Sequence, residues 1–155
     1  MTSGLPRGYV LKALDEIDST NEEARRLAAA GAAAGTVVWA KRQTAGRGRR
    51  GRSWISEPGN LFTSLILRPH VPPARAAELT FVASLAVAQA VAGFLPGRII
   101  CTKWPNDVLV DGGKIAGILI ESAAGTSGKV DWLVVGIGIN VAHHPNDTEI
   151  GRAHV

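Results

Sequence analysis

The segment at residues 42–54, RQTAGRGRRGRSW, contains five arginines and three glycines between two apolar stretches. Glycines let backbone N–H groups approach a bound group closely and let a loop change shape. Arginine side chains are permanently charged, and their planar donor geometry matches carboxylate and phosphate groups. The segment therefore predicts an anion clamp. On this segment alone, a solvated basic loop or a contact for RNA remains open as well.

The glycines of this segment also satisfy the dinucleotide-binding spacing G-x-G-x-x-G, at Gly46, Gly48 and Gly51. That motif requires a strand before the glycines, a helix after them and an acidic residue about 20 positions further on. A strand is predicted before the segment, but Pro58-Gly59 and another strand follow it in place of a helix. The pattern therefore disfavours a dinucleotide site of this type.

A second segment, TKWPNDVLVDGGKIAGILIE at residues 102–121, places an amide and a carboxylate, Asn106 and Asp107, after a predicted strand. These groups could hold a nucleotide sugar or a metal ion, although Asn-Asp after a proline is also typical of a simple turn. Lys114 follows a predicted turn at the start of an apolar strand. It could face a phosphate or carboxylate, or lie in solvent at the sheet edge.

A third segment, VVGIGINV, places Gly136, Gly138 and Asn140 on one face of a predicted strand and apolar residues on the other. Glycines weaken a strand unless another group must approach its backbone closely. The face is therefore predicted either to form the floor of a ligand site or to receive a packed helix.

Strands and helices must position these three segments. Strands are predicted at residues 9–17, 36–41, 60–69, 98–104 and 129–141, with a hairpin turning at residues 111–113. Ser19 and Glu22 have the spacing of a capping box for a helix that stops near Gly31. Residues 74–95 are apolar nearly all round, which predicts a buried helix. The sequence thus predicts an α+β fold, with a mixed, largely antiparallel sheet and helices packed on it.

The composition fits one domain, since the chain has 155 residues of which 46% are hydrophobic. The formal net charge of +4 is local, because without the five arginines of residues 42–54 the balance would be slightly negative. Cys101 is the only cysteine, which excludes an internal disulfide and a cysteine-rich metal cluster and fits a cytoplasmic location. No signal-peptide pattern opens the sequence, and the apolar stretch at residues 81–95 is shorter than a membrane span.

Five motifs in order, STN (residues 19–21), QTAGRGRRGRSW, KWPND, K-x-x-G-I-L-x-E (residues 114–121) and GIGINV, resemble the catalytic domain of biotin protein ligases. The resemblance covers residues 9–141 and implies the fold shared with class II aminoacyl-tRNA synthetases. It also implies a reaction in which ATP activates biotin as biotinyl-5′-adenylate. Biotin then passes to a lysine on the biotin carboxyl-carrier domain of an acyl-CoA carboxylase.

The resemblance implies a role for each matching residue. The biotin site would contain Ser19, Thr20, Asn21, Gln43, Arg47, Gly48, Arg49, Lys114 and Gly117. The nucleotide site would contain Arg49, Arg50, Arg52, Trp54, Asn106, Asp107, Gly138 and Asn140. Lys114, Arg47 and Arg49 would be catalytic, with Lys114 the main residue, and Asp107 would hold Mg²⁺.

The sequence departs from the family at both ends. About eight residues precede the first strand, so we expect no DNA-binding domain and no DNA partner, and we expect no membrane partner. Residues 1–149 are expected to be a catalytic domain that is incomplete at its C-terminus, and residues 150–155 a non-native tail. A homodimer is compatible with the resemblance. The alternatives are a lipoate-type ligase, an RNA-binding module and a remnant that binds biotin without turnover.

Overall fold

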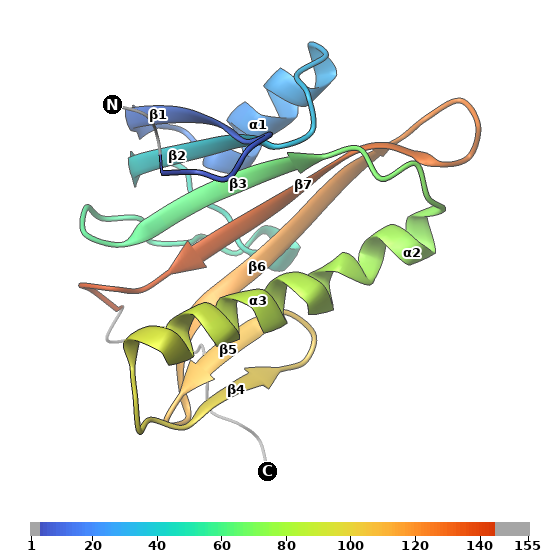
Figure 1. The fold of residues 1–155 in the computed structure, drawn as a ribbon. Coiled ribbons are helices and arrows are strands. Elements are labelled where there is room, and N and C mark those ends of the chain that lie inside the picture. Colours follow the sequence, from blue (N-terminus) through green and yellow to red (C-terminus); the bar gives the residue numbers. More distant parts are fainter. Residues whose placement is uncertain (1–3, 145–155) are drawn as a thin grey trace.

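The computed structural model describes residues 4–144, whose strands form one seven-stranded sheet in the order β1-β2-β3-β7-β6-β5-β4 (Figure 1). The strands are β1 (Val10–Ile17), β2 (Thr36–Gln43), β3 (Leu61–Leu67), β4 (Ile100–Lys103), β5 (Asp107–Val110), β6 (Gly113–Ala124) and β7 (Val130–Ile139). The helices are α1 (Thr20–Ala29), α2 (Pro73–Ala77) and α3 (Leu79–Phe94), and a short 3₁₀ turn, η1, covers Arg49–Gly51. The tail expected at residues 150–155 lies outside the described residues, as do the last residues assigned to the domain.

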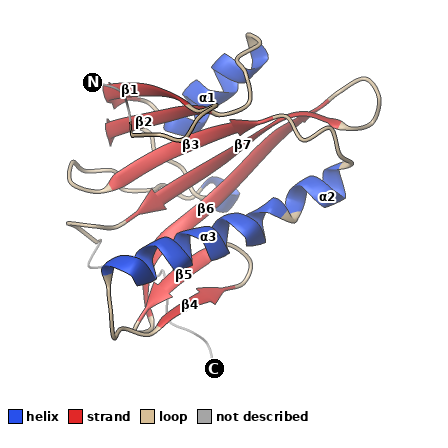
Figure 2. Ribbon diagram, in the orientation of Figure 1, coloured by secondary structure: helices blue, strands red, loops and turns tan. Residues whose placement is uncertain are grey.

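The sheet is mixed, as predicted, because β1 and β2 are parallel and every other neighbouring pair is antiparallel. The parallel pair requires a crossover, which α1 provides (Figure 2). The β5–β6 hairpin turns at Asp111 and Gly112, whose φ angles of 48° and 83° match the type I′ turn that such a two-residue loop favours. The predicted α+β fold is confirmed.

The helices α1 and α3 lie on opposite faces of the sheet. Along β7, Trp132 and Val134 pack in the hydrophobic cluster of α1, while Leu133 and Val135 pack in the cluster of α3. Side chains alternate between the two faces of a strand, so these two pairs point in opposite directions. Gly136 and Gly138 continue the α1 face, and this face carries the site described below.

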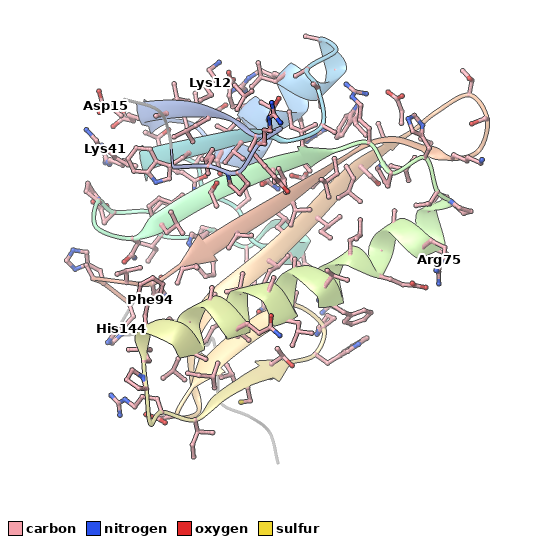
Figure 3. All side chains as sticks on the ribbon, viewed as in Figure 1. Lys12, Asp15, Lys41, Arg75, Phe94 and His144 are labelled. Carbon is pink, nitrogen blue, oxygen red and sulfur yellow. The ribbon has the colours of Figure 1, made fainter. Side chains whose placement is uncertain are left out.

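The apolar segment at residues 74–95 differs from the single buried helix that was predicted. The helix tightens at Glu78, where the backbone N–H of Glu78 donates to the carbonyl of Arg75 and that of Phe81 donates to the carbonyl of Glu78, each three residues earlier in the chain. Helix α2 therefore ends before α3 begins. Only one side of α3 meets the sheet, and Phe94 at its end is 85% exposed (Figure 3). By length and composition alone, the longer segment Pro73–Phe94 could cross a membrane: it has 22 residues, and an 18-residue window within it has a mean hydropathy of 1.5. The apolar stretch at residues 81–95, taken by itself, remains shorter than a span. The packing of α3 on the sheet accounts for only part of this composition, because 22% of that window is buried.

The start of α1 confirms half of the predicted capping box. Ser19 is the N-cap, and its side chain accepts a hydrogen bond from the backbone N–H of Glu22. The carboxylate of Glu22 does not return the bond; the backbone N–H of Ser19 donates to Asp18 at 2.7 Å instead. Glu22 is drawn away because the guanidinium groups of Arg25 and Arg47 lie beside it.

Stability at acid pH should depend on Asp18. Hydrogen bonds from Arg26 are the main reason that the pKa of Asp18 falls from 3.8 to about 2. A carboxyl group whose pKa is lower in the folded state stabilises it above the unfolded pKa, and this contribution is lost as the pH falls through the folded value. We therefore expect the free energy of unfolding, measured with urea, to fall between about pH 4 and pH 2.

In the Asp18→Asn variant this pH dependence should be shallower. Some slope should remain, because hydrogen bonds from Lys12, and then Arg26, also lower the pKa of Glu23. The same slope in Asp18→Asn and in the unmodified protein would contradict the assignment.

Candidate active site

A cavity of about 400 Å³ lies on the α1 face of the sheet, and its size suits a small-molecule ligand. It gathers residues from all three segments that the sequence analysis selected. The predicted site residues that line it are Ser19, Thr20, Asn21, Gln43, Arg47, Gly48, Arg49, Arg50, Arg52, Trp54, Asn106, Asp107, Lys114, Gly117 and Gly138, together with Gly136.

Asn140 is the predicted site residue that does not line this cavity. Its side-chain oxygen faces the amide of Asn60 at 3.4 Å, just beyond the end of β7. The side-chain oxygen of Asn60 in turn accepts hydrogen bonds from three consecutive backbone N–H groups, those of Val141, Ala142 and His143. In this structure Asn140 therefore belongs to a cluster that fixes the chain after β7.

One wall of the cavity is polar and already ordered by hydrogen bonds. Ser19, Thr20 and Asn21 are only 3–5% exposed at the start of α1. The side-chain oxygen of Gln43 accepts bonds from the backbone N–H of Thr20 at 2.8 Å and from its hydroxyl at 3.0 Å. The amide of Gln43 donates to Ser56 at 2.9 Å. Because each group is held by another, the wall presents fixed donors and acceptors.

Ser64 on β3 supports this wall and was missed by the sequence analysis. It is fully buried, and its hydroxyl lies 2.6 Å from the side-chain oxygen of Asn21 and 2.9 Å from the hydroxyl of Thr20. Buried and half-buried residues alternate along β3, and Ser64 takes a buried position between Phe62 and Ile66 on the same face. A hydroxyl at a core position needs a hydrogen-bond partner, so this alternation was a usable signal.

The segment at residues 42–54, here called the arginine loop, folds back on itself over the cavity. The backbone N–H of Gly48 donates to Arg52 at 2.7 Å, and that of Trp54 donates to Gly46 at 2.9 Å. At its tip Arg50 and Gly51 have φ angles of 57° and 72°, which suit a glycine and strain an arginine. Arg49 reaches the KWPND segment, donating to the side-chain oxygen of Asn106 at 3.2 Å. The loop is thus an ordered hairpin that touches both other segments.

The glycines of β6 and β7 admit the indole ring of Trp54. A Cβ atom on Gly138 would lie 2.7 Å from the ring, and one on Gly117 would lie 3.0 Å from it. The close approach that the sequence predicted for these strands is therefore made by the protein's own tryptophan. Gly136 makes room for α1 instead, since a Cβ atom there would lie 2.0 Å from the side-chain oxygen of Asn21.

Lys114 and Asp107 form an ion pair inside the cavity. Their charged atoms are 2.9 Å apart, and their side chains are only 16% and 20% exposed. The Lys114 ammonium also lies 5.4 Å from the centroid of the Trp54 ring, within the range of a cation–π contact. This places a fixed positive charge at the meeting point of the arginine loop, β5 and β6.

The donor set near Asp107 fits Mg²⁺ only with help from a ligand. Within residues 4–144, no three His, Cys, Asp or Glu side chains are grouped to hold a metal ion. Mg²⁺ often takes one or two carboxylates together with substrate phosphates and water. Asp107 could supply one such carboxylate when a phosphate is present.

The family model for biotin/lipoate A/B protein ligases matches residues 13–140. The chain belongs to this family. A biotin–[acetyl-CoA-carboxylase] ligase of Paracoccus denitrificans is 47% identical over 134 residues, which is 86% of this chain and 55% of that protein. The chain therefore spans about half the length of this relative.

Two solved structures of the family are similar in fold. The biotin protein ligase of Leishmania major, in complex with biotinyl-5-AMP, has a TM-score of 0.78 at 32% identity, covering 95% of this chain and 62% of that one. The ligase of Aquifex aeolicus, in complex with biotin and ATP, has a TM-score of 0.70 at 38% identity, covering 88% and 55%. The resemblance to a biotin protein ligase catalytic domain is thereby confirmed.

Proposed function

We propose that this chain carries the active site of a biotin–[acetyl-CoA-carboxylase] ligase. The observation that carries the proposal is a single cavity that joins a fixed polar wall at Ser19–Asn21 and Gln43 to the cations Arg49 and Lys114. The wall suits the ureido ring of biotin, and the cations suit its carboxylate and a phosphate. The similar proteins named above include one bound to biotinyl-5-AMP and one bound to biotin and ATP.

In the first step, a carboxylate oxygen of biotin forms a bond to the α-phosphorus of ATP, and pyrophosphate leaves. Two anions must meet, so positive charge fixed in advance lowers the barrier. Lys114 and Arg49 would supply that charge, and the side chains lining the cavity would hold the two groups in line. Mg²⁺, when bound beside Asp107, would neutralise phosphate charge.

In the second step, the ε-amine of an acceptor lysine attacks the carbonyl carbon of the adenylate, and AMP leaves. The arginine loop would cover the adenylate and keep out water, which would otherwise hydrolyse it. By analogy with the Paracoccus relative, the acceptor would be the carrier domain of acetyl-CoA carboxylase. We place the enzyme in the cytoplasm, where its exposed cysteine, Cys101, stays reduced, and a homodimer remains a prediction.

Isothermal titration with biotin, with and without a non-hydrolysable ATP analogue, tests this function directly. We expect saturable biotin binding, at least about tenfold tighter than lipoate binding, or about 1.4 kcal/mol. Tighter lipoate binding would assign the chain to the lipoate branch of the family. Salt-sensitive RNA binding by the folded protein, with no response to biotin, would overturn the ligase proposal.

A further inference from the structure

Arg47 lines the cavity and belongs to a group of four charged side chains in mutual contact: Arg47 in the arginine loop, Glu22 and Arg25 on α1, and Glu121 on β6. Arg47 donates hydrogen bonds to Glu22 and, at 3.3 Å, to Glu121. Arg25 donates to the same two carboxylates at 2.8 and 3.4 Å. The loop is therefore tied through Arg47 to two elements that lie far from it in the sequence.

Other residues hold in place the two carboxylates, Glu22 and Glu121, that accept the hydrogen bonds of Arg47. Arg25 bridges the two carboxylates and offsets their repulsion. The amide of Asn21 donates to Glu121 at 2.9 Å, while its oxygen faces Ser64, so Glu121 is also joined to the polar wall. Glu22 is free for this role because Asp18 takes the backbone N–H that a capping box would assign to Glu22.

The charges of its neighbours distinguish Arg47 from Arg49 and Lys114, the other two cations assigned to the site. Arg47 faces two carboxylates, whereas Lys114 faces one, Asp107 at 2.9 Å. The contact of Arg49 is the neutral amide of Asn106. If Arg47 turned to an anionic ligand, Glu22 and Glu121 would be left near that ligand with Arg25 alone. Both carboxylates are only about a quarter exposed, so their repulsion of an anion would be incompletely screened.

We propose that Arg47 is a positioning residue, whose side chain latches the arginine loop to Glu22 and Glu121, while Arg49 and Lys114 meet the anionic ligand. This revises the role expected for the Arg47 side chain from the family resemblance. The latch holds the hairpin over the cavity and links it, through Asn21, to the polar wall. Its existence does not depend on the identity of the ligand.

Limited trypsin digestion of the ligand-free protein tests the latch, because the loop tip offers cleavage sites after Arg49, Arg50 and Arg52. Cleavage of a native protein follows the population of its locally open form. We expect Glu22→Gln, Glu121→Gln and Arg47→Ala each to speed cleavage at these three sites about three- to fivefold, as read by mass spectrometry. The double variant Arg47→Ala/Glu22→Gln should be cleaved no faster than Arg47→Ala, because the two residues act through one contact.

Glu16→Gln is the matched control, since Glu16 pairs with Arg42 at 2.8 Å at the base of the same loop without reaching its tip. Its cleavage rate should equal that of the unmodified protein. Cleavage of both glutamine variants at the unmodified rate would overturn the latch, as would equal acceleration in the control.

Biotin titration of the same variants provides a second test, which rests on the proposed function. A latch predicts that Glu22→Gln does not strengthen biotin binding and changes it by less than about threefold, because a loop that is mostly closed without ligand stays mostly closed. If Arg47 instead contacted the ligand carboxylate, removing Glu22 would release it and strengthen binding. Failure of the unmodified protein to bind biotin would contradict the proposed function and leave the trypsin result for the latch intact.

Discussion

Replacing Lys114 with alanine is expected to slow formation of biotinyl-adenylate by about a hundredfold to a thousandfold, the usual effect of removing one fixed charge or donor from a transition state. Lys114 is the largely buried cation beside Asp107, at 16% exposure. The measurement is biotin-dependent release of pyrophosphate from ATP, with the acceptor protein absent so that only the first step is followed.

Two further variants make this result specific. Lys129→Ala removes an exposed lysine just before β7, outside the residues that line the cavity, and should leave the rate unchanged. Asp107→Asn keeps Lys114 but removes its partner, so it separates loss of the cation from loss of the pair. A Lys114→Ala enzyme that retained a rate within about threefold of the unmodified protein would remove Lys114 from the mechanism.

Replacing Gly136 with alanine is expected to destabilise the fold by about 1–3 kcal/mol, as overpacking of a core does, and to weaken biotin binding by at least about tenfold. The added Cβ would lie 2.0 Å from the side-chain oxygen of Asn21, so Asn21 must move. Asn21 contacts both Ser64 and Glu121. Its displacement would therefore disturb the polar wall together with the Glu121 carboxylate that accepts a hydrogen bond from Arg47. Urea unfolding and biotin titration measure the two effects.

Gly93→Ala is the matched control for this substitution. Gly93 lies in α3, and a Cβ atom added there meets nothing within 4 Å. Alanine is a better helix former than glycine by up to about 1 kcal/mol, so this variant should be as stable as the unmodified protein or slightly more stable, with unchanged biotin binding. If Gly136→Ala behaved like Gly93→Ala, the close packing of Asn21 against β7 would be contradicted.

The sequence by itself determined the features that depend on neighbouring residues. The Ser19 cap, the Asp111-Gly112 turn and the alternation along β7 all follow from local backbone geometry, and the structure confirms each of them. The ordered motifs likewise located most of the candidate site before any spatial arrangement was known, because each motif keeps its chemical groups at fixed spacing along the chain.

Only the tertiary structure decided which partner each side chain meets. Glu22 has the spacing of a capping residue, yet its carboxylate goes to Arg47, 25 positions away in the sequence. Ser64 supports Asn21 across 43 positions, and the indole ring of Trp54 packs against Gly138. The exposed side of α3 and the position of Asn140 were also beyond prediction. Periodicity fixes the direction of a side chain relative to its own strand or helix, whereas the group it meets there depends on how distant segments pack.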